Sequence, residues 1–137
     1  MTEPLLLDTC AAIWAAEDRL ADASAELLTH HYRSGVALFL SPVTGWELGL
    51  LFSRGRLRGS RSPAEFLRHI LRVPGVRLAA MPPEVLLASS FLPGSPPADP
   101  SDRILAATAR EYGYTLMTRD AALLDYAGEG HIHAVAC

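Results

Sequence analysis

Short apolar runs alternate with helical segments along all of this 137-residue chain, and few folds accommodate that alternation. Runs at residues 5–7, 36–40, 76–79 and 114–117 have the length and composition of buried strands, and a weaker one lies at 133–135. The connections between them are too long for hairpins, so successive strands are expected to run parallel. The sequence therefore predicts an α/β fold, a three-layer α/β/α sandwich around a central, mainly parallel sheet of four to five strands.

Helices are expected between these runs, and several begin at a capping residue followed by proline. Ser41-Pro42, Ser62-Pro63 and Asp99-Pro100 each combine a side chain that accepts hydrogen bonds with a residue suited to the first helical turn. The expected helical segments surround residues 11–14, cover 22–32, follow Pro42, and then cover 63–73, 83–90, 100–112 and 121–126. Gly113 is the expected end of the 100–112 helix.

Size and composition predict one compact domain over residues 1–137. Half of the residues are hydrophobic, which is sufficient for a full core in a chain of this length. No apolar run is long enough to span a membrane, no signal pattern precedes the first strand, and two cysteines make no disulfide framework. These features predict a cytoplasmic protein with no membrane partner.

The basic charge is concentrated in one segment. All twelve basic residues are arginine, and residues 54–77 hold seven of them with one acid, a net charge of +6 in a chain whose total is −3. A basic patch between acidic flanks is typical of a surface for nucleic acid or for an acidic protein, and a solvated helix face has the same composition. The arginines that begin this patch are Arg54, Arg56, Arg58 and Arg61.

Four acids are expected at one edge of the sheet. Asp8 follows the first strand and Asp120 follows the fourth, while Glu47 and Asp102 lie in the first turns of helices that begin near the same edge. Asp102 shares a helical stripe with apolar residues such as Leu105, and Glu47 shares one with Val43, Leu50 and Leu51. A carboxylate on an apolar stripe is costly unless something compensates its charge.

Taken singly, each of these acids has a structural alternative. Asp8, Asp99 and Asp120 are well placed as helix N-caps, Glu47 could close a capping box with Thr44, and Asp102 could close one with Asp99.

Taken together, the acids favour a metal site. Two carboxylates about 6 Å apart repel by roughly 3 kcal/mol at an effective dielectric constant of ~20, so a cluster requires a cation or shifted pKa values. Oxygen-only ligands without histidine or cysteine suit Mg²⁺ or Mn²⁺. Receiver domains and haloacid-dehalogenase-type phosphatases also place acids at strand ends, but both typically use a lysine, which this chain lacks. That lack counts strongly against a receiver and moderately against a phosphatase.

Four blocks of the sequence carry a family resemblance. In order and spacing, LLLDT (5–9), Trp46-Glu47, DPSDRILAATA (99–109) and LMTRDAALLDY (116–126) resemble a PIN-domain ribonuclease of the VapC toxin type; residues 54–98 match by length and helical character alone. The resemblance implies a Mg²⁺- or Mn²⁺-dependent endoribonuclease that cleaves structured RNA such as transfer or ribosomal RNA. It also implies inhibition by a cognate antitoxin, and a homodimer or toxin–antitoxin hetero-oligomer.

The resemblance also implies the roles of individual residues. The catalytic, metal-binding acids would be Asp8, Glu47, Asp102 and Asp120, supported by Thr9, Thr118 and Asp99. Ions held by these acids would activate a water molecule that attacks phosphorus in line and leaves 5′-phosphate and 3′-hydroxyl ends. The family often has His-Gly where Pro97-Ala98 stands here, so a hydrogen bond from that histidine is not expected.

The arginine patch and two alternative functions remain open at this level. Arg54, Arg56, Arg58 and Arg61 would contact either RNA phosphates or the antitoxin, for which the family has a groove along the helices after Glu47. A non-catalytic PIN-fold binding module is the second hypothesis. A phosphatase that forms an acyl-phosphate on Asp8 is the third.

Overall fold

A five-stranded parallel sheet lies at the centre of the computed structural model, which describes residues 3–57 and 59–137. The strands are β1 (Leu5–Leu7), β2 (Leu38–Leu40), β3 (Val76–Leu78), β4 (Thr115–Thr118) and β5 (His133–Ala136), in the spatial order β3-β2-β1-β4-β5. Every neighbouring pair is parallel, with Leu6 of β1 opposite Phe39 of β2 and Leu116 of β4. The predicted fold class is confirmed.

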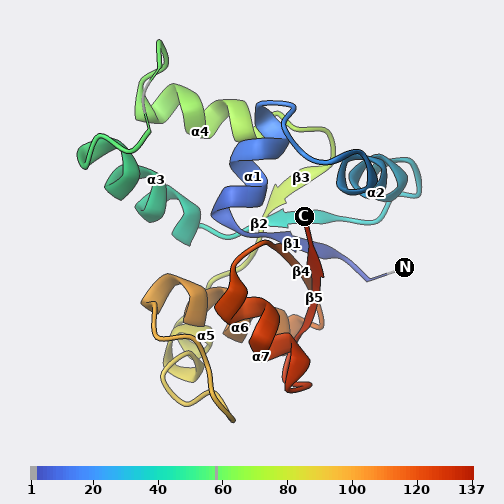
Figure 1. The fold of residues 1–137 in the computed structure, drawn as a ribbon, viewed down its shortest axis with the longest axis vertical. Coiled ribbons are helices and arrows are strands. Elements are labelled where there is room, and N and C mark those ends of the chain that lie inside the picture. Colours follow the sequence, from blue (N-terminus) through green and yellow to red (C-terminus); the bar gives the residue numbers. More distant parts are fainter. Residues whose placement is uncertain (1–2, 58) are drawn as a thin grey trace.

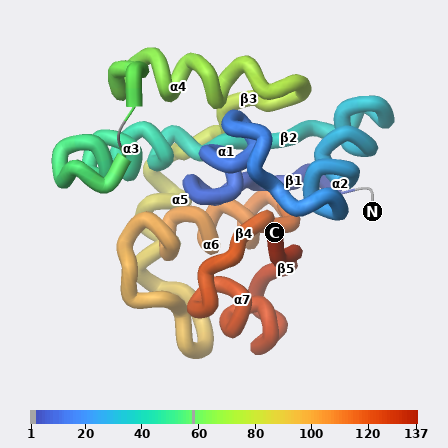
Figure 2. The backbone as a smooth tube through the Cα atoms, turned by 45° about the horizontal axis from the view of Figure 1, so that its top comes forward, coloured from blue at the N-terminus to red at the C-terminus, as the bar shows by residue number. Residues whose placement is uncertain are grey.

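Helices cover both faces of this sheet. They are α1 (Thr9–Ala16), α2 (Asp22–Arg33), α3 (Val43–Ser53), α4 (Pro63–Leu71), α5 (Pro83–Ala88), α6 (Pro100–Tyr112) and α7 (Ala121–Gly128). Figures 1 and 2 show α1, α2 and α4 on one side of the sheet and α5, α6 and α7 on the other. Helix α3 projects from one edge and contacts α1, α4 and α6. In the described part of the chain, every helix is too short or too polar to cross a lipid bilayer.

The central strand β1 contributes to two separate cores. Leu5 and Leu7 pack with α1, α2 and α4 residues such as Ile70, whereas Leu6 packs on the other face with α6 and α7 residues such as Tyr126. Successive side chains of a strand point to opposite faces, so a strand covered on both sides must be apolar at every position. This explains the unbroken Leu5-Leu6-Leu7 run.

Side chains cap the helices where the sequence predicts. Asp8, Ser62, Asp99 and Asp120 each accept a backbone hydrogen bond at the first turn of α1, α4, α6 and α7 respectively. Gly113 ends α6 with φ +70°, a left-handed conformation that glycine adopts without steric cost. Two of these caps, Asp8 and Asp120, are aspartates that come after β1 and β4, so capping itself places carboxylates at the carboxyl edge of the sheet.

Helix α3 differs from the prediction at its start and on its buried face. Pro42 precedes the helix instead of opening it, and the Ser41 hydroxyl accepts a hydrogen bond from the Val43 N–H at 3.1 Å. The predicted stripe of Val43, Glu47, Leu50 and Leu51 holds for Val43, which is buried, and for Leu51, which is half-buried against the core. It omits Leu48, which is buried, while Glu47 and Leu50 are half-buried. The buried positions of α3 are Val43, Thr44 and Leu48, since the helix extends past the sheet and packs against other helices.

We expect Leu6→Ala to lower the free energy of unfolding by about 2–5 kcal/mol, because it leaves a cavity at a side chain with 0% exposure. Leu87→Ala is the matched control, since Leu87 is 67% exposed and its loss should cost no more than about 0.5 kcal/mol. Urea unfolding followed by circular dichroism measures both. Equal losses would contradict the assignment of Leu6 to the core.

Candidate active site

The carboxyl ends of β1 and β4 open into an acidic cleft of about 450 Å³. Its lining includes all four of the predicted catalytic acids and the acid that precedes α6: Asp8, Glu47, Asp99, Asp102 and Asp120. They come from segments up to 112 residues apart in the sequence, and the parallel sheet brings them together.

Asp8 is the most buried of these acids and is held rigidly. One carboxylate oxygen accepts a hydrogen bond from the Ala11 N–H at 2.7 Å, and the other accepts one from the Thr118 hydroxyl. Burial raises the pKa of Asp8, while these hydrogen bonds act in the opposite direction. Thr118 also accepts from the Asp120 N–H at 3.0 Å, so one hydroxyl connects two of the acidic residues.

Glu47 is held by α1 and not by its own helix. The Thr9 hydroxyl donates to Glu47 Oε1 at 2.6 Å. The Thr9 and Thr44 hydroxyl oxygens lie 3.3 Å apart, and because the Thr9 proton is directed to Glu47, Thr44 is the donor of that pair. Burial raises the pKa of Glu47, and the bond from Thr9 opposes this rise. The alternative capping box between Thr44 and Glu47 is therefore not what this structure contains.

Asp102 presents a carboxylate to the cleft that accepts no hydrogen bond from the described residues. Burial, followed by the charges of Asp120, Asp99, Glu47 and Asp8, raises the pKa of Asp102 to about 7. The ionised form of Asp102 is thus the one that a bound cation would stabilise most.

Asp99 and Asp120 serve as caps and also line the cleft. Asp99 Oδ1 accepts from the Ser101 N–H, the Ser101 hydroxyl and the Asp102 N–H at 2.9, 2.6 and 3.2 Å. The hydroxyl of Ser101 and these backbone bonds lower the pKa of Asp99 despite partial burial. Asp120 Oδ2 accepts from the Leu123 N–H at 3.0 Å. Asp99 and Asp120 are therefore both helix N-caps and residues of the cleft.

The acids of the cleft are not neutralised by basic side chains. Over residues 3–57 and 59–137 the ion pairs are Arg19–Glu17 at 3.6 Å and His131–Glu129 at 3.8 Å, both outside the cleft. Carboxylates without a basic partner are the donor set that a hard divalent cation prefers, and three of those in the cleft, Asp8, Glu47 and Asp102, also have raised pKa values.

The spacing of the acids is wider than a coordination sphere. Within the described residues, no three His, Cys, Asp or Glu side chains lie close enough together to hold one ion as they stand. The residue types fit Mg²⁺ or Mn²⁺, and binding would require carboxylates to move inward. Asp102 has the freedom to do so, because its carboxylate is bound to none of the described groups.

Three side chains around the cleft were not among the predicted site residues. Arg119 and Cys10 line it, and burial raises the pKa of the Cys10 thiol. Arg103 donates from Nε to the Ser89 carbonyl at 2.9 Å and from a terminal nitrogen to the Pro97 carbonyl at 3.1 Å, which fixes the loop before α6. The sequence signal that could have identified them is their proximity to predicted site residues, since each lies within two positions of one.

The predicted arginine surface lies beside the cleft in part. Arg54 and Arg56 line a hollow of about 390 Å³ that shares Glu47 and Asp99 with the cleft and includes Trp46, which is 53% exposed. Arg61 is exposed in the connection to α4, and Arg58 lies outside the described residues.

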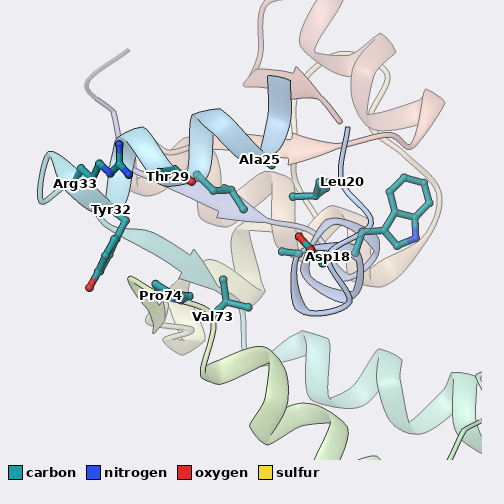
Figure 3. Close-up of a pocket in the computed structure, with 11 residues that line it drawn as sticks. Asp18, Leu20, Ala25, Thr29, Tyr32, Arg33, Val73 and Pro74 are labelled. Atoms are coloured by element: carbon teal, nitrogen blue, oxygen red, sulfur yellow. The ribbon is translucent and has the colours of Figure 1, made fainter. Parts of the chain in front are cut away.

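Another hollow, shown in Figure 3, has a different character. It measures about 420 Å³ and is formed by α2, the turn after α1 and the segment before β3, with Leu20, Tyr32 and Val73 in its lining. Its charged residues are Asp18 and Arg33, so it lacks the acidic cluster that marks the cleft.

Comparison with known proteins assigns this chain to a family. The PIN domain family matches residues 5–129, so the chain belongs to the PIN domain family. Ribonuclease VapC22 from Mycobacterium tuberculosis (strain ATCC 25618 / H37Rv) is 32% identical over 121 residues, which are 88% of each protein. The resemblance inferred from the four sequence blocks is confirmed.

Solved structures agree with this assignment at the level of the fold. VapBC2 from Rickettsia felis, bound to a DNA fragment from its promoter, matches with a TM-score of 0.72 and 12% identity, over 97% of this chain and 98% of that chain. DNA-bound VapBC from Salmonella typhimurium matches with a TM-score of 0.68 and 15% identity, over 98% of each chain.

We expect the metal-free protein to lose stability as pH rises from about 4 to 7. The raised pKa of Asp102, about 7 against an ordinary 3.8, means that the folded state binds more protons than the unfolded state in this window. The stabilisation is therefore complete below the ordinary value and is lost above pH 7. In urea unfolding with EDTA at pH 5 to 8, Asp102→Asn should flatten this decline. The exposed Asp125→Asn control should retain it, and a parallel decline in wild type and Asp102→Asn would refute the raised pKa.

Proposed function

We propose that this chain is a Mg²⁺- or Mn²⁺-dependent endoribonuclease and the toxin of a toxin–antitoxin pair. One observation carries the proposal: five carboxylates line one cleft, and none of them is in an ion pair with a described residue. The protein that holds them has a PIN domain and is 32% identical to a named ribonuclease. A cleft of this composition does not suit a polyanion until a cation is present.

PIN ribonucleases generally use divalent metal ions, and the chain's own residues define where one would be held. Asp8 and Asp102 would be the principal direct ligands, with Glu47 and Asp120 completing the set. When bound, such an ion polarises a phosphoryl oxygen and acidifies water. Its charge would also reverse the effect of burial on the pKa of Asp102, so that this group is ionised at neutral pH.

The remaining residues orient these ligands. Thr118 and the first turn of α1 fix both oxygens of Asp8, and Thr9 fixes Glu47. Asp99 caps α6 and so determines where Asp102 emerges. Asp8 is held by hydrogen bonds and the Asp102 carboxylate is not, so Asp102 is the ligand that would move toward a bound cation.

Hydrolysis without a covalent enzyme intermediate is the chemistry that these residues support. The pKa of the Cys10 thiol is raised, which makes it a poor nucleophile at neutral pH. Both oxygens of Asp8 are engaged in hydrogen bonds and the side chain is buried, which disfavours an acyl-phosphate and hence the phosphatase hypothesis. Attack by water would leave 5′-phosphate and 3′-hydroxyl ends.

The hollow beside α3 is the proposed antitoxin site. Exposed Trp46 and half-buried Leu50 offer apolar contacts, and Arg54 and Arg56 offer positive charge next to Glu47. The matching structures from Rickettsia felis and Salmonella typhimurium are VapBC assemblies, which supports a protein partner for this chain in a hetero-oligomer.

A non-catalytic PIN module is the second candidate. The wide spacing of the carboxylates favours it, because no three described acids are close enough to hold an ion as they stand. It predicts neither metal binding nor cleavage, and the following experiment separates the two.

Purified chain, free of any partner, should cleave bulk transfer or ribosomal RNA in Mn²⁺ or Mg²⁺ and not in EDTA. Asp8→Asn and Asp102→Asn should each lower kcat/KM at least about 100-fold, as loss of one charge-stabilising group does in other enzymes. Asp125→Asn, an exposed acid on α7, should stay within about two-fold of wild type. Mapping of the RNA ends tests the chemistry, and undiminished cleavage in EDTA would exclude the metal-dependent reaction.

The double variant Arg54→Ala/Arg56→Ala should weaken binding of the cognate antitoxin by about ten-fold or more, since charged contacts at interfaces are worth a few kcal/mol. Arg61→Ala is the control, because Arg61 is exposed and does not line the hollow. Calorimetric titration measures both. Unchanged antitoxin affinity together with weaker RNA binding would assign this surface to RNA instead.

A further inference from the structure

We propose that Arg119 binds a phosphate of the RNA at the mouth of the acidic cleft and that Trp14 positions it. This inference rests on the proposed ribonuclease function and names a substrate-binding residue for it. It arises from a juxtaposition of a guanidinium, an indole ring and a cluster of acids that the sequence places far apart.

The acidic cleft needs a cation of its own to receive RNA. Five carboxylates line it, and phosphodiesters carry a negative charge at every linkage. In the described part of the chain, Arg119 is the basic side chain among the residues that line this cleft. It is exposed, so a phosphate can reach it.

The backbone on both sides of Arg119 is anchored. The Thr118 carbonyl accepts a hydrogen bond from the Cys137 N–H at 3.1 Å, and the Thr118 hydroxyl donates to Asp8. Asp120 caps α7 through the Leu123 N–H. The arginine therefore starts from a fixed point between two residues of the site.

Arg119 rests on an aromatic ring and not on an acid. Its guanidinium carbon lies 4.1 Å from the centroid of the Trp14 ring, within the range of a cation–π contact. The described residues place no carboxylate within ion-pair distance of it, although several acids line the same cleft.

This arrangement suits recognition of phosphate. A guanidinium that stacks through its planar face keeps the N–H groups along its edge available, and those groups match two oxygens of a phosphate. Trp14 follows Cys10 by one helical turn on α1, and Cys10 lines the cleft, so the ring holds the arginine beside the acids. The ring also keeps the guanidinium from collapsing onto a carboxylate.

A second arginine on the same ring supplies a matched comparison. Arg19 lies 5.8 Å from the Trp14 centroid, but it pairs with Glu17 at 3.6 Å and is not among the residues that line the cleft. Arg19 and Arg119 thus have the same charge and the same aromatic neighbour. They differ in two respects: Arg19 is in an ion pair and Arg119 is not, and Arg119 lines the cleft whereas Arg19 does not.

The test measures RNA binding separately from cleavage. In an Asp8→Asn background with Mg²⁺, anisotropy of fluorescein-labelled bulk transfer RNA is recorded over a series of KCl concentrations. Arg119→Ala should raise Kd about five-fold or more and lower the slope of log K against log salt by about 0.7–0.9, the value for loss of one phosphate contact. Arg119→Lys should keep the slope and lose part of the affinity, and Arg19→Ala should change neither.

Cleavage kinetics test the positioning role of Trp14. With Asp8 intact, Arg119→Ala and Trp14→Leu should raise KM with kcat within about two-fold, and Trp14→Phe, which keeps an aromatic face, should restore part of the loss. The assignment is overturned if Arg119→Ala leaves affinity and salt slope unchanged, if Arg19→Ala has an equal effect, or if kcat falls with KM unchanged. Absence of any cleavage by wild type would instead refute the proposed function, while the binding series still decides the role of Arg119.

Discussion

The bond between the Thr118 hydroxyl and the Asp8 carboxylate is the interaction on which the site depends. It joins the ends of β1 and β4, the two strands in the middle of the acidic edge, and it leaves Asp8 buried with both oxygens occupied. The same threonine receives the N–H of Asp120, so the position of three residues is coupled through one side chain. Removal of this hydroxyl would leave a buried carboxylate short of a donor, which is costly in a low-dielectric interior.

Helix N-termini make the concentration of negative charge tolerable in the absence of a cation. Asp8, Asp99 and Asp120 cap α1, α6 and α7, so the positive ends of three helix dipoles face the edge where the carboxylates gather. Helix capping and acid placement are therefore the same structural feature. Asp102 caps no helix, and its pKa is raised to about 7.

Guanidinium groups near the site bind neutral partners, and this leaves the acids without a basic partner. Arg103, next to Asp102 in the sequence, donates to the carbonyls of Ser89 and Pro97, and Arg119 lies over an indole ring. Each guanidinium therefore has a partner without forming an ion pair with a carboxylate of the cleft. The proposed binding of a divalent ion and then of RNA requires this separation of charges.

The sequence by itself determined the alternation of strands and helices, the caps of α1, α4, α6 and α7, and which acids belong together, because apolar periodicity and capping are local properties of the chain. Only the tertiary structure decided that Thr9 holds Glu47 and that Arg119 lies on Trp14, since these contacts join residues 38 and 105 positions apart. It also added Leu48 to the buried face of α3 beside the half-buried Leu51, because that face is set by the neighbouring helices. Side-chain partners across elements depend on how the layers pack, and no local pattern records that packing.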